Sequence, residues 1–369
     1  MDISKKIAFQ PEVFQNIIQK LGVVDIFKGG WDLIENKEKR YLKELRDIAT
    51  IQSIGSSTRI EGATLTDEEV KQLLKSVQIN KLDKREEQEV VGYYEALELI
   101  LSHYEDIELS ERYLHQLHAV LLKYSSKDQR HKGRYKNLSN QVVANYPDGE
   151  QKVIFRTTEP HLTASEMHDL ISWTNEQLSE KKLHPIIIIC VFVYEFLSIH
   201  PYQDGNGRLS RLITTLLLIK SEYDFVQYAS VEYEIEKRKK DYYKALMAGQ
   251  KNRNTKKEKI NDWILFFLET LKQTIIKLES EYELIKEKKS YLNDRQKEVL
   301  EFIENSEPVK ISDLTKSLQK FTSYILKKDV KYLVDEGQII KIGEHHHIFA
   351  CVAPKTGMFR YSSWVVFMH

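Results

Sequence analysis

Residues 199–211 (IHPYQDGNGRLSR) gather side chains suited to acid–base and phosphate chemistry into one short stretch between two apolar segments. The His200 imidazole has an ordinary pKa near neutrality, which suits it to take a proton from an attacking hydroxyl. Asp204 is a suitable ligand for a hard cation such as Mg²⁺. Burying so many polar groups is costly unless they are satisfied, so the cluster indicates function rather than packing.

The second half of this stretch predicts a phosphate cradle. Gly205 and Gly207 let the backbone approach a ligand closely, and a helix starting there presents free N–H groups to an anion. Arg208 and Arg211 are three residues apart, so they share a helix face and can clamp phosphate oxygens. The alternative, an ordinary Gly-rich interhelical loop, explains DGNG alone but not the whole stretch. The set therefore predicts a transfer from a nucleoside triphosphate.

Position by position, the stretch resembles the signature of the Fic family, HPFx(D/E)GNGRxxR, with Tyr202 in place of the usual Phe. The resemblance implies an all-helical core that transfers AMP from ATP to a Tyr, Thr or Ser hydroxyl of a target protein (AMPylation). It implies that His200 is the general base, that Asp204 holds Mg²⁺ and that Arg211 meets the γ-phosphate. The residues implied to receive the phosphates are Gly205, Asn206, Gly207, Arg208 and Arg211. Doc proteins, which are similar but phosphorylate their targets, have Lys at the position of Gly207, so the resemblance favours AMP transfer. Members that move other phosphate-linked groups share the signature.

A second motif lies far upstream, where residues 54–62 read IGSSTRIEG. It resembles the inhibitory motif (S/T)xxxE(G/N) of Fic proteins, with Ser57, Glu61 and Gly62 at the fixed positions. The spacing predicts Ser57 and Glu61 one turn apart on one helix face. The resemblance implies that Glu61 pairs with Arg211 in the place of the γ-phosphate, a class II arrangement, and that Glu61 can serve in de-AMPylation. Read alone, the motif is also an ordinary helix end stopped by Gly62.

Residues 133–160 differ in composition from the helical segments around them, with β-favouring runs on either side of Tyr146-Pro-Asp-Gly. These runs predict a hairpin. The Fic resemblance implies that this hairpin is a flap whose edge holds the target as an added strand. The candidate edge residues are Lys152, Val153, Ile154 and Phe155. The alternative is a surface hairpin without a role. Gly133-Arg-Tyr resembles the family's GxYR, with Lys136 in place of Arg.

Three further signals admit plainer interpretations. Tyr243 belongs to a YYxAL stretch that resembles the family's border of the nucleotide, but an aromatic residue at helical spacing is equally core packing. His115 and His118 have the spacing of metal ligands, as does the run 345–347, but neither has a supporting carboxylate or cysteine set. The basic run between residues 237 and 259 suits nucleic acid or a solvated face.

The elements that must position these residues are mostly helical, because few segments look like strands and the 369 residues include only 7 Pro and 14 Gly. Apolar residues at three- and four-residue spacing predict several amphipathic helices. The segments are Ile34–Ile51, Val70–Val77, Val90–Leu101, Leu109–Leu122 and Met167–Leu178. Two almost continuously apolar helices, Pro185–Ile199 and about Gly207–Ser221, flank the chemical stretch and are predicted to be central.

A long helix, Ile264–Lys289, becomes steadily more charged and leads to a separate module beginning near Tyr291. That module reads as three helices (Asp294–Glu304, Ile311–Leu318 and about Phe321–Asp335, which ends at Gly337) and two strands (Gln338–Ile342 and His346–Val352). This is the order of a winged helix. We therefore expect an N-terminal helical region over 1–105, a Fic catalytic core with trailing helices over 106–290 and a winged-helix domain over 291–369.

Composition excludes several classes of protein. Lys+Arg and Asp+Glu both number 55, so a generally basic nucleic-acid coat is excluded, although a local basic face is not. Two distant cysteines offer neither a disulfide framework nor a CxxC zinc site. The first residues lack the apolar stretch of a signal peptide, and the longest apolar run is too short to cross a bilayer. We expect no membrane partner and a reducing, cytoplasmic location.

Two functions remain open from the sequence. The first is an autoinhibited protein adenylyltransferase whose winged helix recruits a protein, with self-modification and homodimerisation as further expectations. The second is a DNA-binding regulator in which the helix 321–335 enters a major groove and the Fic core acts as a sensor. Lys327, Lys328 and Lys331 favour this second function, and Asp329, Asp335 and Glu336 offset them.

Overall fold

A computed structural model describes residue 3 and residues 5–37, 39–76, 82–145, 151–289, 292–306, 308–336, 338–342 and 349–352. The chain separates into two compact units, Met1–Tyr282 and Glu283–His369, which are described separately. The finer domain boundaries expected from the sequence stay predictions. In the described part of the chain no helix is both long and apolar enough to cross a membrane.

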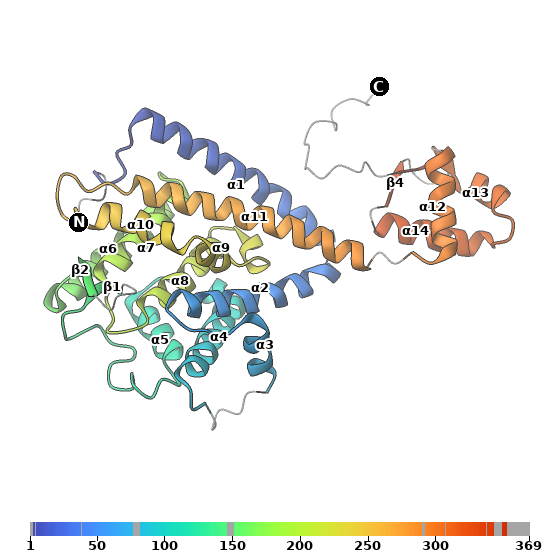
Figure 1. Cartoon of the computed structure of the whole chain (residues 1–369). Helices are drawn as coiled ribbons and strands as arrows, with labels where there is room; N and C mark the ends of the chain where they lie inside the picture. Colours follow the sequence, from blue (N-terminus) through green and yellow to red (C-terminus); the bar gives the residue numbers. More distant parts are fainter. Residues whose placement is uncertain are drawn as a thin grey trace. The chain divides into compact units, whose positions relative to one another are not determined.

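The first unit is built from helices, with one two-stranded hairpin (Figure 1). The predicted mostly helical architecture is confirmed. Its elements are α1 (Pro11–Lys37), α2 (Lys39–Ile60), α3 (Asp67–Lys75), α4 (Arg85–His103), η2 (Tyr104–Asp106), α5 (Glu111–Leu121), β1 (Gln141–Asn145), β2 (Gln151–Arg156), α6 (Pro160–Glu180), α7 (Pro185–Ile199), α8 (Asn206–Lys220), η3 (Asp224–Gln227), α9 (Val231–Lys237), α10 (Lys239–Gln250) and α11 (Asn261–Lys289), the last of which continues into the second unit.

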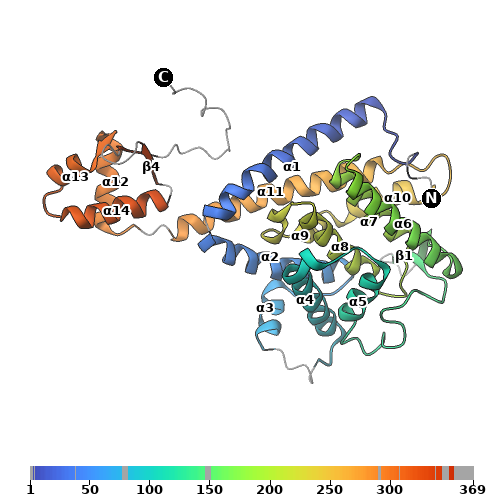
Figure 2. The same cartoon turned by 180° about the vertical axis from the view of Figure 1, so that it is seen from behind.

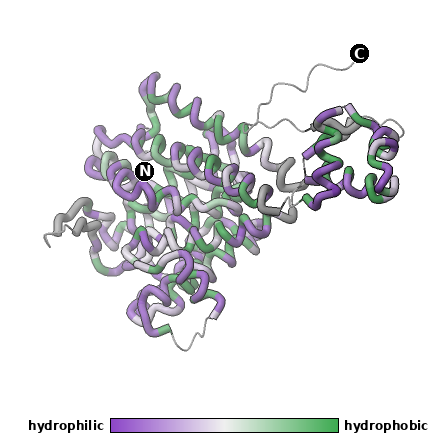
Figure 3. Tube along the Cα trace, turned by 45° about the vertical axis from the view of Figure 1, so that its right-hand side comes forward, coloured by the Kyte–Doolittle hydropathy of each residue, from purple (hydrophilic) through white to green (hydrophobic). Residues whose placement is uncertain are grey.

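Helices α7 and α8 form the centre of this unit, as their continuous apolar sequences predict. Every residue of Ile186–Ile199 is buried, and so is every residue of Arg208–Ile219. A helix that is apolar on all sides is stable only when other elements cover all of it. Outer helices show the amphipathic pattern instead, with hydrophobic (green) and hydrophilic (purple) residues interleaved in Figure 3. The loop between α7 and α8 is therefore anchored at both ends in the core.

Helix α1 was not predicted before residue 34, and the expected helix 34–51 is divided between α1 and α2. One stripe of α1 is buried, through Ile17, Leu21 and Val24, but Phe14 and Ile26 are exposed at 52% and 67%. Apolar residues on several sides blur the helical period that the sequence analysis relied on. The helix lies beside α11 in both views (Figures 1 and 2), and an ion pair joins Lys20 to Glu269 across them.

The predicted hairpin is formed by β1 and β2, which pair antiparallel from Gln141 opposite Arg156 to Asn145 opposite Gln151. An irregularity in the register between Val142 and Val143 locally bends the ladder, as a bulge does. The expected turn at 146–149 lies outside the described residues. The hairpin leads directly into α6, so its base is fixed to the helical body.

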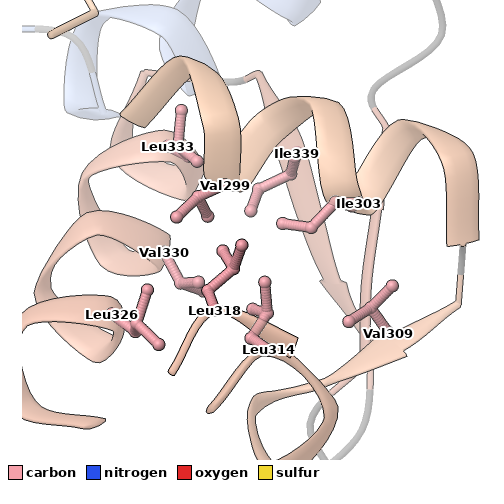
Figure 4. Close-up of a cluster of buried hydrophobic side chains, with 9 residues drawn as sticks. All are labelled: Val299, Ile303, Val309, Leu314, Leu318, Leu326, Val330, Leu333 and Ile339. Atoms are coloured by element: carbon pink, nitrogen blue, oxygen red, sulfur yellow. The ribbon is translucent and has the colours of Figure 1, made fainter. Parts of the chain in front are cut away.

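The second unit follows the predicted order of three helices and two strands. Its elements are α12 (Asp294–Ser306), β3 (Val309–Lys310), α13 (Ile311–Ser317), α14 (Ser323–Asp335), β4 (Ile339–Ile342) and β5 (Phe349–Val352). The short strand β3 was not predicted, because two residues carry no alternation to detect. It pairs antiparallel with β5, giving the sheet order β3-β5-β4. The core consists of Val299, Ile303, Val309, Leu314, Leu318, Leu326, Val330, Leu333 and Ile339 (Figure 4). Tyr291, Gly337 and the histidines at 345–347 lie outside the described residues.

Candidate active site

The loop between α7 and α8 turns sharply at both of its ends. His200 follows α7 in a left-handed conformation (φ 54°), and its N–H closes the helix by donating to Phe196 O at 2.8 Å. Gly205 precedes α8 with φ 78°, a conformation that glycine adopts at little cost. Because α8 begins at Asn206, its first N–H groups and its positive dipole end face the loop. The loop thus lies at an anion-binding helix end.

His200 is placed to act as a base. Its Nδ1 lies 3.3 Å from Leu197 O, and since a carbonyl only accepts, Nδ1 carries the proton. Nε2 is then the nitrogen with a free lone pair. Burial lowers the pKa of His200 to about 4. The imidazole is therefore neutral at pH 7 and able to accept a proton.

The loop is folded around the ring of Tyr202, which replaces the family's Phe in a fully buried position. The ring stacks on His118 with centroids 3.9 Å apart, and its hydroxyl lies 3.0 Å from His115 Nδ1. His118 Nε2 donates to Asp204 O at 3.0 Å, while its Nδ1 accepts from the Gly133 N–H at 2.8 Å. Burial lowers the pKa of His118 to about 4, which agrees with this neutral tautomer. Both histidines thus serve the loop, and neither nitrogen of His118 is available to a metal.

The Asn206 side chain also stabilises the loop, through hydrogen bonds to the Tyr202 backbone. Its side-chain amide accepts from the Tyr202 N–H at 2.9 Å and donates to Tyr202 O at 2.7 Å. The side chain is buried and both of its polar ends are used. The polar group that Asn206 leaves for a ligand is therefore its backbone N–H at the start of α8, and its side chain shapes the loop.

The two arginines of α8 leave N–H groups unused inside the protein. Arg208 is 2% exposed and lies 3.3 Å from Asp204 and 3.5 Å from Glu89. Within the described residues, Arg208 Nε and Nη1 and Arg211 Nη1 have no hydrogen-bond partner. Buried donors of this kind are costly to leave unsatisfied, so they indicate an anionic ligand.

Asp204 lies at the mouth of the same cradle. Burial acts to raise its pKa, but Arg208 and the Gly205 N–H outweigh burial and hold the pKa below its ordinary value. The Gly205 N–H donates to Asp204 Oδ1 at 2.6 Å, and Arg85 lies 3.3 Å from Oδ2. The carboxylate is therefore ionised at neutral pH. Among the described residues no group of three or more His, Cys, Asp or Glu side chains is arranged to hold a metal.

The upstream motif meets the cradle at Arg211. Arg211 Nε donates to Ser57 Oγ, Nη2 donates to Ser57 O, and Nη2 also donates to Glu61 Oε1, each at 2.8 Å. Glu61 lies directly against Gly207, because a Cβ at that position would overlap the Glu61 carboxylate. The spacing of the motif predicts Glu61 inside a helix, but α2 ends at Ile60 and Gly62 turns away with φ 106°. The motif is thus a helix end and an Arg211 ligand at once.

The ion pair between Glu61 and Arg211 is strong but only partly covered. Burial acts to raise the pKa of Glu61, and the Arg211 guanidinium outweighs it and holds the pKa below its ordinary value. The Arg211 side chain is 5% exposed, whereas that of Glu61 is 34% exposed. A further anchor, missed in the sequence, is Arg59, which donates to both carboxylate oxygens of Glu236 at 2.7 and 2.9 Å and pairs with Asp67.

Residues 108–218 match a protein-family model described as the Fic/DOC family. These residues form a Fic/DOC family domain. Proteins named protein adenylyltransferase Fic from Drosophila willistoni and Drosophila grimshawi are 27% identical to the chain over 184 residues, which is 49% of this chain and 34% and 35% of theirs. The match therefore spans about a third of the length of these relatives.

Solved structures show the same fold. A Fic family protein from Desulfovibrio desulfuricans G20 has a TM-score of 0.62 at 22% identity and covers 96% of this chain and 99% of its own. A Fic domain containing signaling protein from Bacteroides thetaiotaomicron VPI-5482 has a TM-score of 0.56 at 22% identity, covering 73% of this chain and 97% of its own. At these identities the likeness concerns the fold.

Lys136, which stands where the Fic motif GxYR has Arg, connects the flap to the catalytic loop. Its Nζ donates to Asn140 Oδ1, Thr157 Oγ1 and Ile199 O at 2.8 to 2.9 Å. Its backbone N–H donates to Pro201 O at 2.8 Å. Burial, assisted by nearby Arg253, lowers the pKa of Lys136 to about 8. From the sequence, Lys136 is a departure from the motif whose contacts are open. In the structure it joins segments far apart in the chain.

The remaining predicted Fic residues lie around this centre. Tyr243 is half-buried, and its hydroxyl is 3.5 Å from Ile60 O at the end of α2, so it borders the Glu61 segment. The flap residues 152–155 belong to β2, whose end carries Thr157 next to Lys136. Phe155 is buried. The other three flap side chains lie outside the described residues.

Proposed function

We propose that this protein transfers AMP from ATP to a Tyr, Thr or Ser hydroxyl of a target protein and that Glu61 inhibits the transfer. The observation that carries the proposal is the ion pair of Glu61 with Arg211 directly over Gly207, beside a neutral His200. Relatives named protein adenylyltransferase Fic support the same reaction. The set of proposed site residues is the one derived from the sequence.

In this reaction the target oxygen attacks the α-phosphorus of ATP. A new P–O bond forms to the target, the bond from the α-phosphorus to the bridging oxygen breaks, and pyrophosphate leaves. His200 Nε2 takes the proton of the attacking hydroxyl, which suits a neutral imidazole held through Nδ1. The N–H groups at the start of α8 and the unused donors of Arg208 and Arg211 receive the phosphates.

Asp204 fits the role of Mg²⁺ ligand. It is ionised, lies beside the phosphate donors and is 26% exposed in its side chain, so a cation can reach it. Mg²⁺ commonly takes one or two carboxylates and completes its shell with phosphate oxygens and waters. Bound there, the cation supplies charge neutralisation for the phosphate chain.

Glu61 inhibits by occupying Arg211. The carboxylate takes an Nη2 donor that a γ-phosphate needs and fills the space over Gly207, so ATP can bind only unproductively. Because the Glu61 side chain is partly exposed, a small shift in the end of α2 suffices to release it. A carboxylate so close to the transferred group also suits a role in de-AMPylation. The Lys152–Phe155 edge of the flap is the proposed docking strand for the target.

The test is labelling of protein by ATP that carries its label on the α- or the γ-phosphate. Wild type, Glu61→Gly and Glu61→Gln are incubated with Mg²⁺ and each nucleotide, alone and with a cell extract that supplies targets. Because a hydrogen bond between charged groups contributes about 1.5–3 kcal/mol, Glu61→Gly should raise α-label incorporation about tenfold or more. Glu61→Gln, which keeps the size and removes the charge, should give an intermediate value.

Each alternative result has a defined meaning. Incorporation from the γ-label identifies phosphorylation and contradicts AMP transfer. Label on the protein itself identifies self-modification, and label only on extract proteins identifies separate targets. No incorporation from either label, by any variant and with extract present, overturns ATP-dependent transfer and favours another phosphate-linked donor.

A further inference from the structure

Helix α14 presents two chemically different faces. Its inner face contributes Leu326, Val330 and Leu333 to the core of the second unit, as Figure 4 shows. Its outer face carries four exposed residues between positions 324 and 331. They are Tyr324, Lys327, Lys328 and Lys331. We call these four residues the α14 basic face.

The acidic residues of the same helix do not neutralise this face. Asp329 is 2% exposed and accepts from Arg295 at 2.5 and 3.1 Å, so its charge is used inside the unit. Glu336 is also buried, which leaves Asp335 as the exposed acid, at the far end of the helix. In the described part of the chain none of the three lysines pairs with a carboxylate. The offset expected from the sequence is therefore largely internal, and the face is cationic.

Helix α12 of the same unit differs from α14 in its exposed charges. The exposed and half-exposed residues of α12 include the acidic Asp294, Glu298 and Glu301. Its basic residues are Lys297 and Arg295, and Arg295 is paired with Asp329. Lys320, in the turn before α14, pairs with Glu298 at 2.7 Å, so its charge is partly neutralised within the unit. Among the described residues of the second unit, three exposed lysines lie on the α14 basic face, and Lys316 on α13 is a further exposed cation.

We propose that the α14 basic face binds duplex DNA, with α14 lying in the major groove. This function lies beyond the proposed transfer of AMP and does not depend on it. A single exposed helix has the width that the major groove admits, and in helix-turn-helix proteins the helix that follows a turn after another helix is the one that lies in the groove. Lys327 and Lys331 are one turn apart, about 6 Å along the axis, so they can meet phosphates of one strand.

The chemistry of the face also predicts the kind of binding. Lysines act as point charges on phosphates, and the face carries no arginine to read a guanine with two hydrogen bonds. Tyr324 is 78% exposed and offers an apolar ring and a hydroxyl at the start of the helix. Binding should therefore depend steeply on salt and weakly on base sequence.

The experiment uses the full chain and a fluorescein-labelled 30-base-pair duplex of mixed sequence, with binding followed by polarisation at several salt concentrations. The test variant is Lys327→Gln with Lys328→Gln and Lys331→Gln. The matched control is Lys256→Gln with Lys257→Gln and Lys297→Gln, which removes the same number of exposed charges from elsewhere, including the basic run in the first unit. Thermal unfolding checks that both variants keep the fold.

We expect the α14 variant to bind at least about tenfold more weakly and to lose about 2–3 units of the slope of log K against log salt, since each phosphate contact contributes about 0.9. The control should stay within about twofold of wild type. The proposal is overturned if wild type does not bind the duplex, if the control loses as much as the test variant, or if the α14 variant binds normally. If polyglutamate binds the chain as tightly as the duplex does and displaces the duplex, the face binds an acidic protein instead of DNA.

Discussion

The catalytic loop and the end of α2 meet at Arg211, yet the protein holds them in different ways. The loop is fixed from several directions, by His118 on α5 and by Lys136 and Asn140 in the connection between α5 and β1. Glu61 lies beyond the last turn of its helix and reaches the site through one partly exposed carboxylate.

The residues proposed for catalysis are therefore held more firmly than the residue proposed for inhibition. Groups that must be positioned for catalysis are built into the core, where packing and satisfied hydrogen bonds leave one arrangement. Glu61, the proposed inhibitory group, is attached where a small movement of the backbone removes it without disturbing the loop. The predictions below act on one side of this contrast at a time.

The largest effect is expected at the base. His200→Ala in the Glu61→Gly background should reduce α-label incorporation by about 10²-fold or more, because general-base catalysis contributes at least that much. The measurement is single-turnover labelling at saturating ATP, with ATP affinity measured separately. An unchanged rate with intact binding would show that another group is the base.

The next effect tests how the loop is held. Lys136→Met in the Glu61→Gly background should lower activity about tenfold, because the Ile199 and Thr157 oxygens lose their common donor and the neighbouring His200 shifts. Lys136→Arg restores the residue of the family motif and should keep most of the activity. If Lys136→Met and Lys136→Arg lose activity equally, the side chain has only a packing role.

Lys136 also predicts a pH dependence with a definite sign. Its pKa is about 8 in the folded protein against an ordinary value of 10.5, so between these values the unfolded chain binds the proton that the folded chain has lost. Through this group, stability increases as pH rises from about 8 to 10. Activity, which needs the charged ammonium, should fall over the same range in wild type but not in Lys136→Arg. The readouts are urea unfolding and labelling rate at each pH.

The parts of this site that could be predicted are those whose residues lie close together in the sequence. The stretch 199–211, the flanking helices and the two flap strands are marked by patterns within a few residues of each other, and the structure has them at nearly the predicted bounds. Tyr202, which stands in place of the motif's Phe, is fully buried. Local pattern therefore defined the loop and the elements that carry it.

Partners distant in the sequence were not predicted. His118 contacts Asp204 across 86 residues, and Arg59 contacts Glu236 across 177. No spacing rule relates such residues, because the helices that carry them are brought together only by tertiary packing. The two histidines were weighed as metal ligands for their spacing, which says nothing about what faces each ring in the folded chain.

Loosening the end of α2 should raise activity less than removing the Glu61 carboxylate does. Arg59→Ala breaks the anchor to Glu236 and Asp67 and should raise wild-type activity about two- to fivefold, the range expected for a partly exposed ion pair. In the Glu61→Gly background it should change nothing, since the carboxylate is already absent. Lys43→Ala, at an exposed position of the same helix, is the matched control. If Arg59→Ala raises activity equally in wild type and in the Glu61→Gly background, Arg59 does not act through Glu61.

The smallest effect is expected at Tyr202, where the chain departs from the family motif. Tyr202→Phe removes the hydroxyl 3.0 Å from His115 and keeps the ring stacked on His118. Activity in the Glu61→Gly background should change less than about threefold, because the other contacts still hold the loop. The free energy of unfolding should fall by about 0.5–1.5 kcal/mol, the net contribution of one hydrogen bond. Adding His115→Ala tests the pair, since a coupling close to zero in this double-mutant cycle would mean that the hydroxyl and the imidazole do not support each other. A large loss of activity from Tyr202→Phe alone would instead mean that the loop, like Glu61, depends on a single contact.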